Sequence, residues 1–105
     1  MLTTHLRIFL GVHRIGNMQK IVSFQHGVRL FHVVDREYYL PDGRHKYSFH
    51  VQDSANNFVF RYDNEPHWAE LPNFPFHKHL SDSVEPSPEM TLEMVFVELE
   101  TMLSP

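Results

Sequence analysis

Turn-forming residues divide the first half of this chain into short segments, and this division favours a fold built mainly from strands. Turn signals occur at Gly16-Asn17, His26-Gly27, Pro41-Asp42-Gly43 and residues 53–57. Glycine accepts the positive φ that tight turns require, and proline sets its own φ to a value that suits them. We predict five strands, at residues 6–15, 21–24, 28–34, 45–52 and 58–62. Residues 38–40 extend the third, and a short helix is the alternative for the first.

The segment HKYSFHVQ, residues 45–52, shows the clearest strand pattern. Tyr47, Phe49 and Val51 alternate with polar residues, which predicts a strand with one buried and one polar face. The turn that follows and residues 58–62 complete an antiparallel hairpin. In this hairpin His50 and Arg61 approach each other only if the register places both on one face.

An amphipathic helix is predicted at residues 91–103. Its apolar residues recur at helical spacing: Leu92, Val95, Phe96, Leu99 and Leu103. Ser87 followed by Pro88, or Thr91, is suited to cap the start of this helix.

The segment between the last strand and the helix, residues 63–88, is rich in proline and polar side chains, which predicts an ordered loop at best. The expected fold class is therefore α+β, in one domain of residues 1–105. It consists of an antiparallel sheet of about five strands with the C-terminal amphipathic helix packed on one face.

The composition of the 105 residues excludes several kinds of protein. There is no cysteine, which excludes disulfide bonds and thiolate zinc sites and suits a reducing cytosol, so we expect a cytoplasmic protein. No apolar run approaches the roughly 20 residues of a membrane span, so no membrane association is expected. The apolar content supports one modest core, which a homodimer or a partner would complete.

The charge is distributed unevenly along the chain. The net charge of -4 argues against nonspecific adhesion to nucleic acid. Residues 1–46, however, carry seven basic and three acidic side chains, whereas residues 80–105 carry six acidic and no basic ones. A fold can therefore still gather its basic groups on one face.

The densest group of titratable side chains lies in RYDNEPHWAELPNFPFHKH, residues 61–79. One interpretation is a metal-independent ribonuclease, because histidine can serve as acid or base near neutral pH. The catalytic candidates are His50, His67, His77, His79 and Asp63, the last as the group that orients a histidine. The phosphate-binding candidates are Arg61 and Lys78, and the base-stacking candidates are Tyr62 and Trp68.

A second interpretation of the same run is a metal site. His77 and His79 are two residues apart, so both project to one side of an extended segment. His67 and Asp63 would complete a set of three or four ligands for Zn²⁺ or another divalent ion. A histidine–x–histidine pair alone is a weak signal, and Lys78 between the two histidines is mildly unfavourable for a bound cation.

A third interpretation is purely structural. Asp63-Asn64 forms an Asx-type turn, Pro66 and Pro75 stiffen the loop, and the histidines bond to loop carbonyls. A non-enzymatic protein that binds RNA or a protein partner through this loop is also compatible with the sequence. Glycine-rich phosphate loops, GxSxG elbows and HExxH helices are absent, so serine or cysteine nucleophile chemistry is not expected.

Three stretches, YSFHVQD, FRYDNEPH and NFPFHKH, resemble the TumE-type toxins of prokaryotic toxin–antitoxin pairs. The resemblance covers roughly residues 43–103. The positions that match the family pattern are His50, Arg61, Asp63, Asn64, Pro66, His67, Pro75, His77 and His79. Trp68 and Phe76 depart from it, since each stands where a histidine is common.

This resemblance implies a growth-inhibiting toxin that is encoded beside a helix-turn-helix antitoxin. It also implies that His67, His77 and His79 form the core of the site, and that RNA is a plausible target. The acidic C-terminal region would lie away from RNA or meet a basic surface of the antitoxin.

Overall fold

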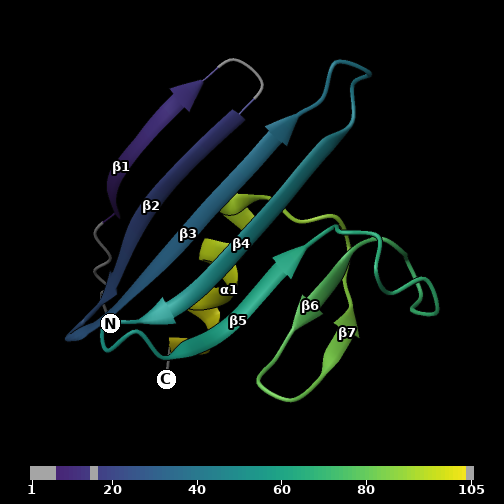
Figure 1. The fold of residues 1–105 in the computed structure, drawn as a ribbon. Helices are drawn as coiled ribbons and strands as arrows, with labels where there is room; N and C mark the ends of the chain where they lie inside the picture. Colours follow the sequence, from purple (N-terminus) through teal and green to yellow (C-terminus); the bar gives the residue numbers. More distant parts are fainter. Residues whose placement is uncertain (1–6, 15–16, 104–105) are drawn as a thin grey trace.

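The fold is a seven-stranded antiparallel sheet followed by one helix (Figure 1), in a computed structural model that describes residues 7–14 and 17–103. Each strand pairs with the next one in the sequence, so the sheet is a simple meander. The strands are β1 Arg7–Arg14, β2 Asn17–His26, β3 Arg29–Tyr39, β4 His45–Asp53, β5 Phe58–Asp63, β6 His77–His79 and β7 Val84–Pro86. The helix α1 is Leu92–Leu103. The α+β prediction is confirmed.

The core lies between α1 and one face of the sheet (Figure 1). Tyr47, Phe49 and Val51 of β4 are all buried, as their alternation predicts. Helix α1 buries Val95, Phe96 and Leu99, while Leu92 and Leu103 pack partly buried at the margin of the core. The ring of Phe96 stacks on Phe24 of β2, with 5.8 Å between centroids. No helix among the described residues is long and apolar enough to cross a membrane.

The turn glycines and the helix cap can be compared with the sequence predictions. Gly27 and Gly43 adopt φ values of +61° and +90°, which disfavour a residue with a Cβ atom. Thr91 caps α1, because its Oγ1 accepts a hydrogen bond of 3.3 Å from the backbone N–H of Met94. Ser87 does not cap the helix; its hydroxyl donates to the carbonyl of Pro88. The predicted turn at Gly16-Asn17 falls partly outside the described residues.

The prediction of a loop for residues 63–88 is wrong in part, because two strands form there. Strand β6 pairs with β5, and β7 pairs with β6. Each is three residues long, with the sequence HKH in β6 and VEP in β7, so neither carries an alternating apolar pattern. Pairing with β5 decides their conformation, and the sheet therefore has seven strands in place of about five.

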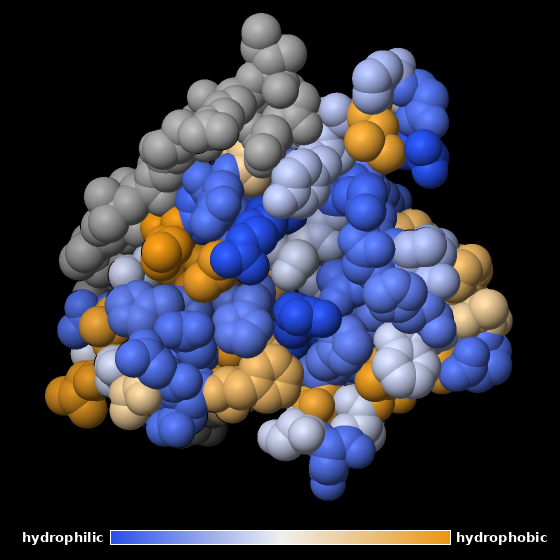
Figure 2. All heavy atoms as spheres, viewed as in Figure 1, coloured by the Kyte–Doolittle hydropathy of each residue, from blue (hydrophilic) through white to orange (hydrophobic). Residues whose placement is uncertain are grey.

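The sheet face opposite α1 is open and polar. Figure 2 views this face and shows hydrophilic side chains over much of its central part. On β4 the side chains directed to it are polar and alternate with the buried Tyr47, Phe49 and Val51. This face holds the residues of the candidate site.

Candidate functional site

Strand register places the candidate residues in two neighbouring rows on the open face. His50 of β4, Arg61 of β5 and His79 of β6 are directly paired in one row. Asp63 of β5 and His77 of β6 are directly paired in the next. Because paired residues on adjacent strands project to the same side, all five side chains share one face. The register therefore places His50 and Arg61 on one face, as their predicted approach required.

Asp63 is the centre of the cluster. Its Oδ1 lies 2.8 Å from Nε2 of His77, and its Oδ2 lies 3.2 Å from Nε2 of His79. The two histidine Nε2 atoms are 3.1 Å apart. Asp63 and His77 expose only 3% and 2% of their side chains, whereas His79 exposes 22%. The cluster thus has a buried inner pair and one histidine that reaches solvent.

Arg61 joins the cluster from the solvent side. Its Nε donates to Oδ2 of Asp63 at 3.1 Å, and its Nη2 lies 3.4 Å from Nε2 of His79. The Arg61 side chain is 41% exposed. One cation therefore sits at the rim of the buried Asp63–His77 pair, where an anionic group from solvent can reach it.

Local backbone features fix the inner pair. Nδ1 of His77 lies 2.8 Å from the carbonyl oxygen of Pro75, and a carbonyl can only accept, so Nδ1 carries the hydrogen. Oδ1 of Asp63 accepts from the backbone N–H of Glu65 at 3.1 Å, which is the predicted Asx turn. The Asx turn and the histidine–carbonyl bond of the purely structural interpretation are therefore both present, and they also orient the cluster.

The Asn64 side chain anchors the start of this loop to β4. Its carbonyl oxygen accepts from the N–H of Tyr47 at 2.9 Å, and its amide donates to the carbonyl of His45 at 2.7 Å. These two bonds continue the β4–β5 pairing beyond Asp63, so the residue next to the centre of the cluster is held in place.

Two histidines of the open face have lowered pKa values. Burial lowers the pKa of His50, and the nearby positive charges of Arg61 and Arg36 lower it further. Burial also lowers the pKa of His79, while the Asp63 carboxylate opposes this by favouring the charged imidazolium. Arg61 and His77 lower the pKa of His79 as well, so both histidines favour the neutral form, and only His79 has a carboxylate that opposes the shift.

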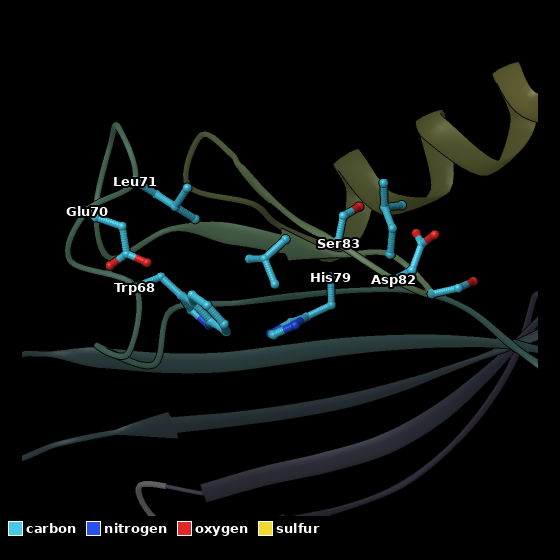
Figure 3. A pocket seen from close by; sticks show the side chains of 9 residues that line it. Trp68, Glu70, Leu71, His79, Asp82 and Ser83 are labelled. Atoms are coloured by element: carbon cyan, nitrogen blue, oxygen red, sulfur yellow. The ribbon is translucent and has the colours of Figure 1, made fainter.

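Trp68 lies beside the two β6 histidines. Its ring meets those of His77 and His79 edge to face, with centroid distances of 6.4 and 6.3 Å. Figure 3 shows Trp68 and His79 pointing toward one another in an open pocket of about 510 Å³. The pocket is lined by Trp68, Glu70, Leu71, His79, Leu80, Ser81, Asp82, Ser83 and Val84. An aromatic ring beside a partly exposed histidine offers a stacking surface next to a titratable group.

Three predicted site residues are not brought to this cluster. Lys78 projects to the opposite face, where its Nζ bonds to Oε2 of Glu98 at 2.6 Å. Tyr62 is buried on that same face and its hydroxyl donates to Glu98. Both follow from strand alternation, since each is one residue away from a member of the cluster. His67 is exposed and is not among the ligand atoms that cluster around Asp63.

Arg36 of β3 and Ser48 of β4 belong to the open face, and the sequence analysis missed them. Arg36 pairs with Ser48, and Ser48 pairs with Asp63, in the same row as His77. Both line a small cleft of about 170 Å³ that also contacts Arg61 and Asp63. For Ser48 the available signal was its position two residues before His50 on the same strand, whereas Arg36 is placed here only by the pairing of β3 with β4.

Comparison with known proteins gives one match. A family model described as Toxin TumE matches residues 11–103, which is most of the chain and includes β2 to β4 as well as the cluster. The match extends well upstream of residue 43, where the resemblance in the sequence fades. No curated protein and no solved structure matches the chain. A toxin of this kind implies an antitoxin partner.

Proposed function

We propose that this chain, which belongs to the TumE toxin family, acts by cleaving RNA at the row formed by His50, Arg61 and His79. The observation that carries the proposal is this row itself: two histidines flank an arginine on adjacent strands of an open face. An arginine between two proton-transferring groups is the arrangement needed to hold a phosphodiester while one bond forms and another breaks.

The chemistry requires a base, an acid and a group that balances the negative charge of the phosphorus centre. The 2′-hydroxyl loses its proton and its oxygen attacks phosphorus. The bond from phosphorus to the 5′-oxygen breaks, and that oxygen takes up a proton. No external co-reactant is needed, because the products are a cyclic phosphate and a free 5′-hydroxyl.

The electrostatics suggest which histidine takes which role. Arg61 and Arg36 disfavour a charged His50, so His50 is suited to accept the proton. Burial, Arg61 and His77 lower the pKa of His79, but the Asp63 carboxylate beside it stabilises an imidazolium, so of the two histidines His79 is the better placed to donate a proton to the leaving oxygen. Nε2 of His79 faces Asp63, and its other ring nitrogen, Nδ1, takes no part in those contacts. His77 orients Asp63 from behind and has no direct role.

Two further groups support binding of the substrate. Arg61 and Arg36 supply positive charge beside His50, which suits an anionic phosphate. Trp68 presents its ring in the pocket next to His79, which suits a base adjacent to the cleaved bond. Glu98, one of the acidic residues that follow β6, bonds to Lys78 on the opposite face of the sheet and not to the substrate face.

The proposal is tested with the purified chain and a synthetic RNA, in the presence of a chelator. We expect cleavage with a cyclic phosphate at the new 3′ end, and a loss of about 100-fold or more in rate for His50→Ala or His79→Ala. His67→Ala should retain the rate of the unaltered chain, because His67 lies outside the cluster. RNA that is bound but not cleaved, or full toxicity in the His50→Ala/His79→Ala double variant, would contradict the proposal.

We further propose that the antitoxin partner is a helix-turn-helix protein encoded beside this chain. The support is electrostatic: residues 80–105 carry six acidic and no basic side chains, which suits a basic partner surface. Coexpression of the neighbouring gene product should restore growth and copurify with the chain. Restored growth without a complex would contradict direct binding.

A further inference from the structure

When the His77 ring is neutral, no hydrogen atom lies between Nε2 of His77 and Oδ1 of Asp63. Nδ1 of His77 already donates to Pro75, so Nε2 of the neutral ring carries only a lone pair. That lone pair faces Oδ1 of the Asp63 carboxylate at 2.8 Å. Two acceptors at this distance repel each other, and both are almost fully buried. A proton or a metal ion must therefore lie in or beside this contact.

The third atom of the group makes a metal ion a suitable occupant. Nε2 of His79 is 3.1 Å from Nε2 of His77 and 3.2 Å from the Asp63 carboxylate. A tetrahedral zinc site with bonds of about 2.0–2.1 Å separates its ligand atoms by about 3.3 Å. His77 faces Oδ1 of Asp63 and His79 faces Oδ2, and one ligand atom from each of the three residues lies within 4.8 Å of the others, so small side-chain shifts would let one ion bind all three.

We propose that Asp63, His77 and His79 bind one divalent transition-metal ion of the zinc class. Two imidazoles and one carboxylate favour zinc, cobalt or nickel over magnesium and calcium, which prefer sets of oxygen ligands. His77 is oriented by Pro75 and Asp63 by Glu65, so both ligands are held in place before the ion arrives. His79 lines the open pocket, which provides a path of entry.

Arg61 is the feature that opposes this site, and it provides a sharp test. Its guanidinium bonds to Asp63 and approaches His79, so it competes with a cation for the same groups. Its side chain is 41% exposed and can therefore turn toward solvent when an ion binds. Removing its charge should strengthen metal binding, although the same change should weaken any action on RNA.

The metal site shares His79 and Asp63 with the proposed cleavage of RNA, so an ion bound there would compete with the role of His79 as proton donor. Its ligands are the inner pair and His79, whereas His50 and Arg36 are not involved. A chain that binds the ion without cleaving RNA, or cleaves RNA without binding the ion, leaves one of the two proposals standing.

The test uses the full chain, purified without a histidine tag and freed of metal with a chelator. Co²⁺ is followed by its visible absorption and Zn²⁺ by titration calorimetry. We expect one ion per chain and a Co²⁺ spectrum typical of low coordination by nitrogen and oxygen ligands. No binding of Zn²⁺ or Co²⁺ at millimolar concentration would overturn the proposal.

Four variants locate the ion. His77→Ala and His79→Ala should each weaken binding by at least about 100-fold, and His79→Ala is the safer of the two because His79 is partly exposed. Arg61→Gln should strengthen binding by about 3- to 5-fold. His67→Ala, the matched control from the same loop, should change affinity by less than about twofold. Equal losses for His67→Ala and His79→Ala would place the ion elsewhere and overturn the assignment.

Discussion

Two aspartates are buried in this sheet, and their surroundings differ sharply. Asp63 on β5 contacts His77, His79 and Arg61 on the open face. Asp35 on β3 is fully buried on the face that α1 covers, and neither of its oxygens has a hydrogen-bond partner among the described residues. The Lys20 ammonium lies 3.6 Å away, beyond hydrogen-bond distance.

The difference shows what burial does to a carboxyl group that has only one cation nearby, at 3.6 Å. Burial raises the pKa of Asp35 to about 7, and the neighbouring Glu37 adds to the shift, while Lys20 only partly opposes it. At Asp63, by contrast, cationic and N–H groups converge on both oxygens. The Asp63 carboxylate is thus surrounded by polar partners on the open face, whereas burial beneath the helix favours the protonated form of Asp35.

The largest expected effect comes from removing the partner of Asp63. His77→Ala should lower the free energy of unfolding by about 3 kcal/mol, because it leaves a cavity and an incompletely paired buried carboxylate. His79→Ala should cost clearly less, since His79 is partly exposed. Urea titrations followed by tryptophan fluorescence measure both. Equal losses of unfolding free energy for the two variants would mean that the buried Asp63–His77 pair contributes no more than the exposed His79.

A smaller effect of opposite sign is expected at Asp35. Asp35→Asn should raise the free energy of unfolding at pH 8 by about 2 kcal/mol, because it removes a charge that burial disfavours. A drop in stability for this variant at pH 8 would show that the ion pair with Lys20 outweighs burial.

The unaltered chain should also lose stability as pH rises. The pKa of Asp35 is 3.8 before folding and about 7 after it, so the native state binds more protons between these values. The stabilising contribution is complete below about pH 4 and is lost as pH rises through 7. Thermal melts from pH 4 to pH 8 measure this trend, and Asp35→Asn should flatten it.

The smallest effect is expected at Lys78, which tests the assignment of faces. Lys78 bonds to Glu98 and lies over the rings of Phe60 and Tyr62, at 4.8 and 5.3 Å from their centroids. Lys78→Gln should cost about 1 kcal/mol or less of stability and leave RNA cleavage within about twofold of the unaltered chain. A large loss of cleavage with an intact fold would instead support the sequence prediction that Lys78 binds phosphate.

Periodic segments were predictable from the sequence, and segments held by long-range pairing were not. The alternation in β4 and the apolar stripe of α1 each carry their own signal, so their buried residues follow directly. Strands β6 and β7 carry none, because each is defined by the strand beside it. An antiparallel sheet was foreseeable, but its meander order and its last two strands required the three-dimensional structure.

The same distinction applies to the site. Density of titratable residues identified Asp63, His77 and His79, and alternation correctly placed the two histidines on one side of their segment. Lys78 was misplaced because closeness in sequence was taken for closeness in space, although a strand sends neighbouring residues to opposite faces. Arg36 was overlooked because it lies 25 positions before Arg61 and meets it only through β4.

The shortness of β6 has a consequence for how long the site persists. The cluster is split across the β5–β6 ladder, which joins only three residues of each strand. Fraying of this ladder would separate His77 and His79 from Asp63 and Arg61, while the longer ladders of β1 to β5 and the helix remain folded. The persistence of the site thus depends on a short ladder at one end of the sheet, and backbone amide exchange at residues 77–79 would report its lifetime.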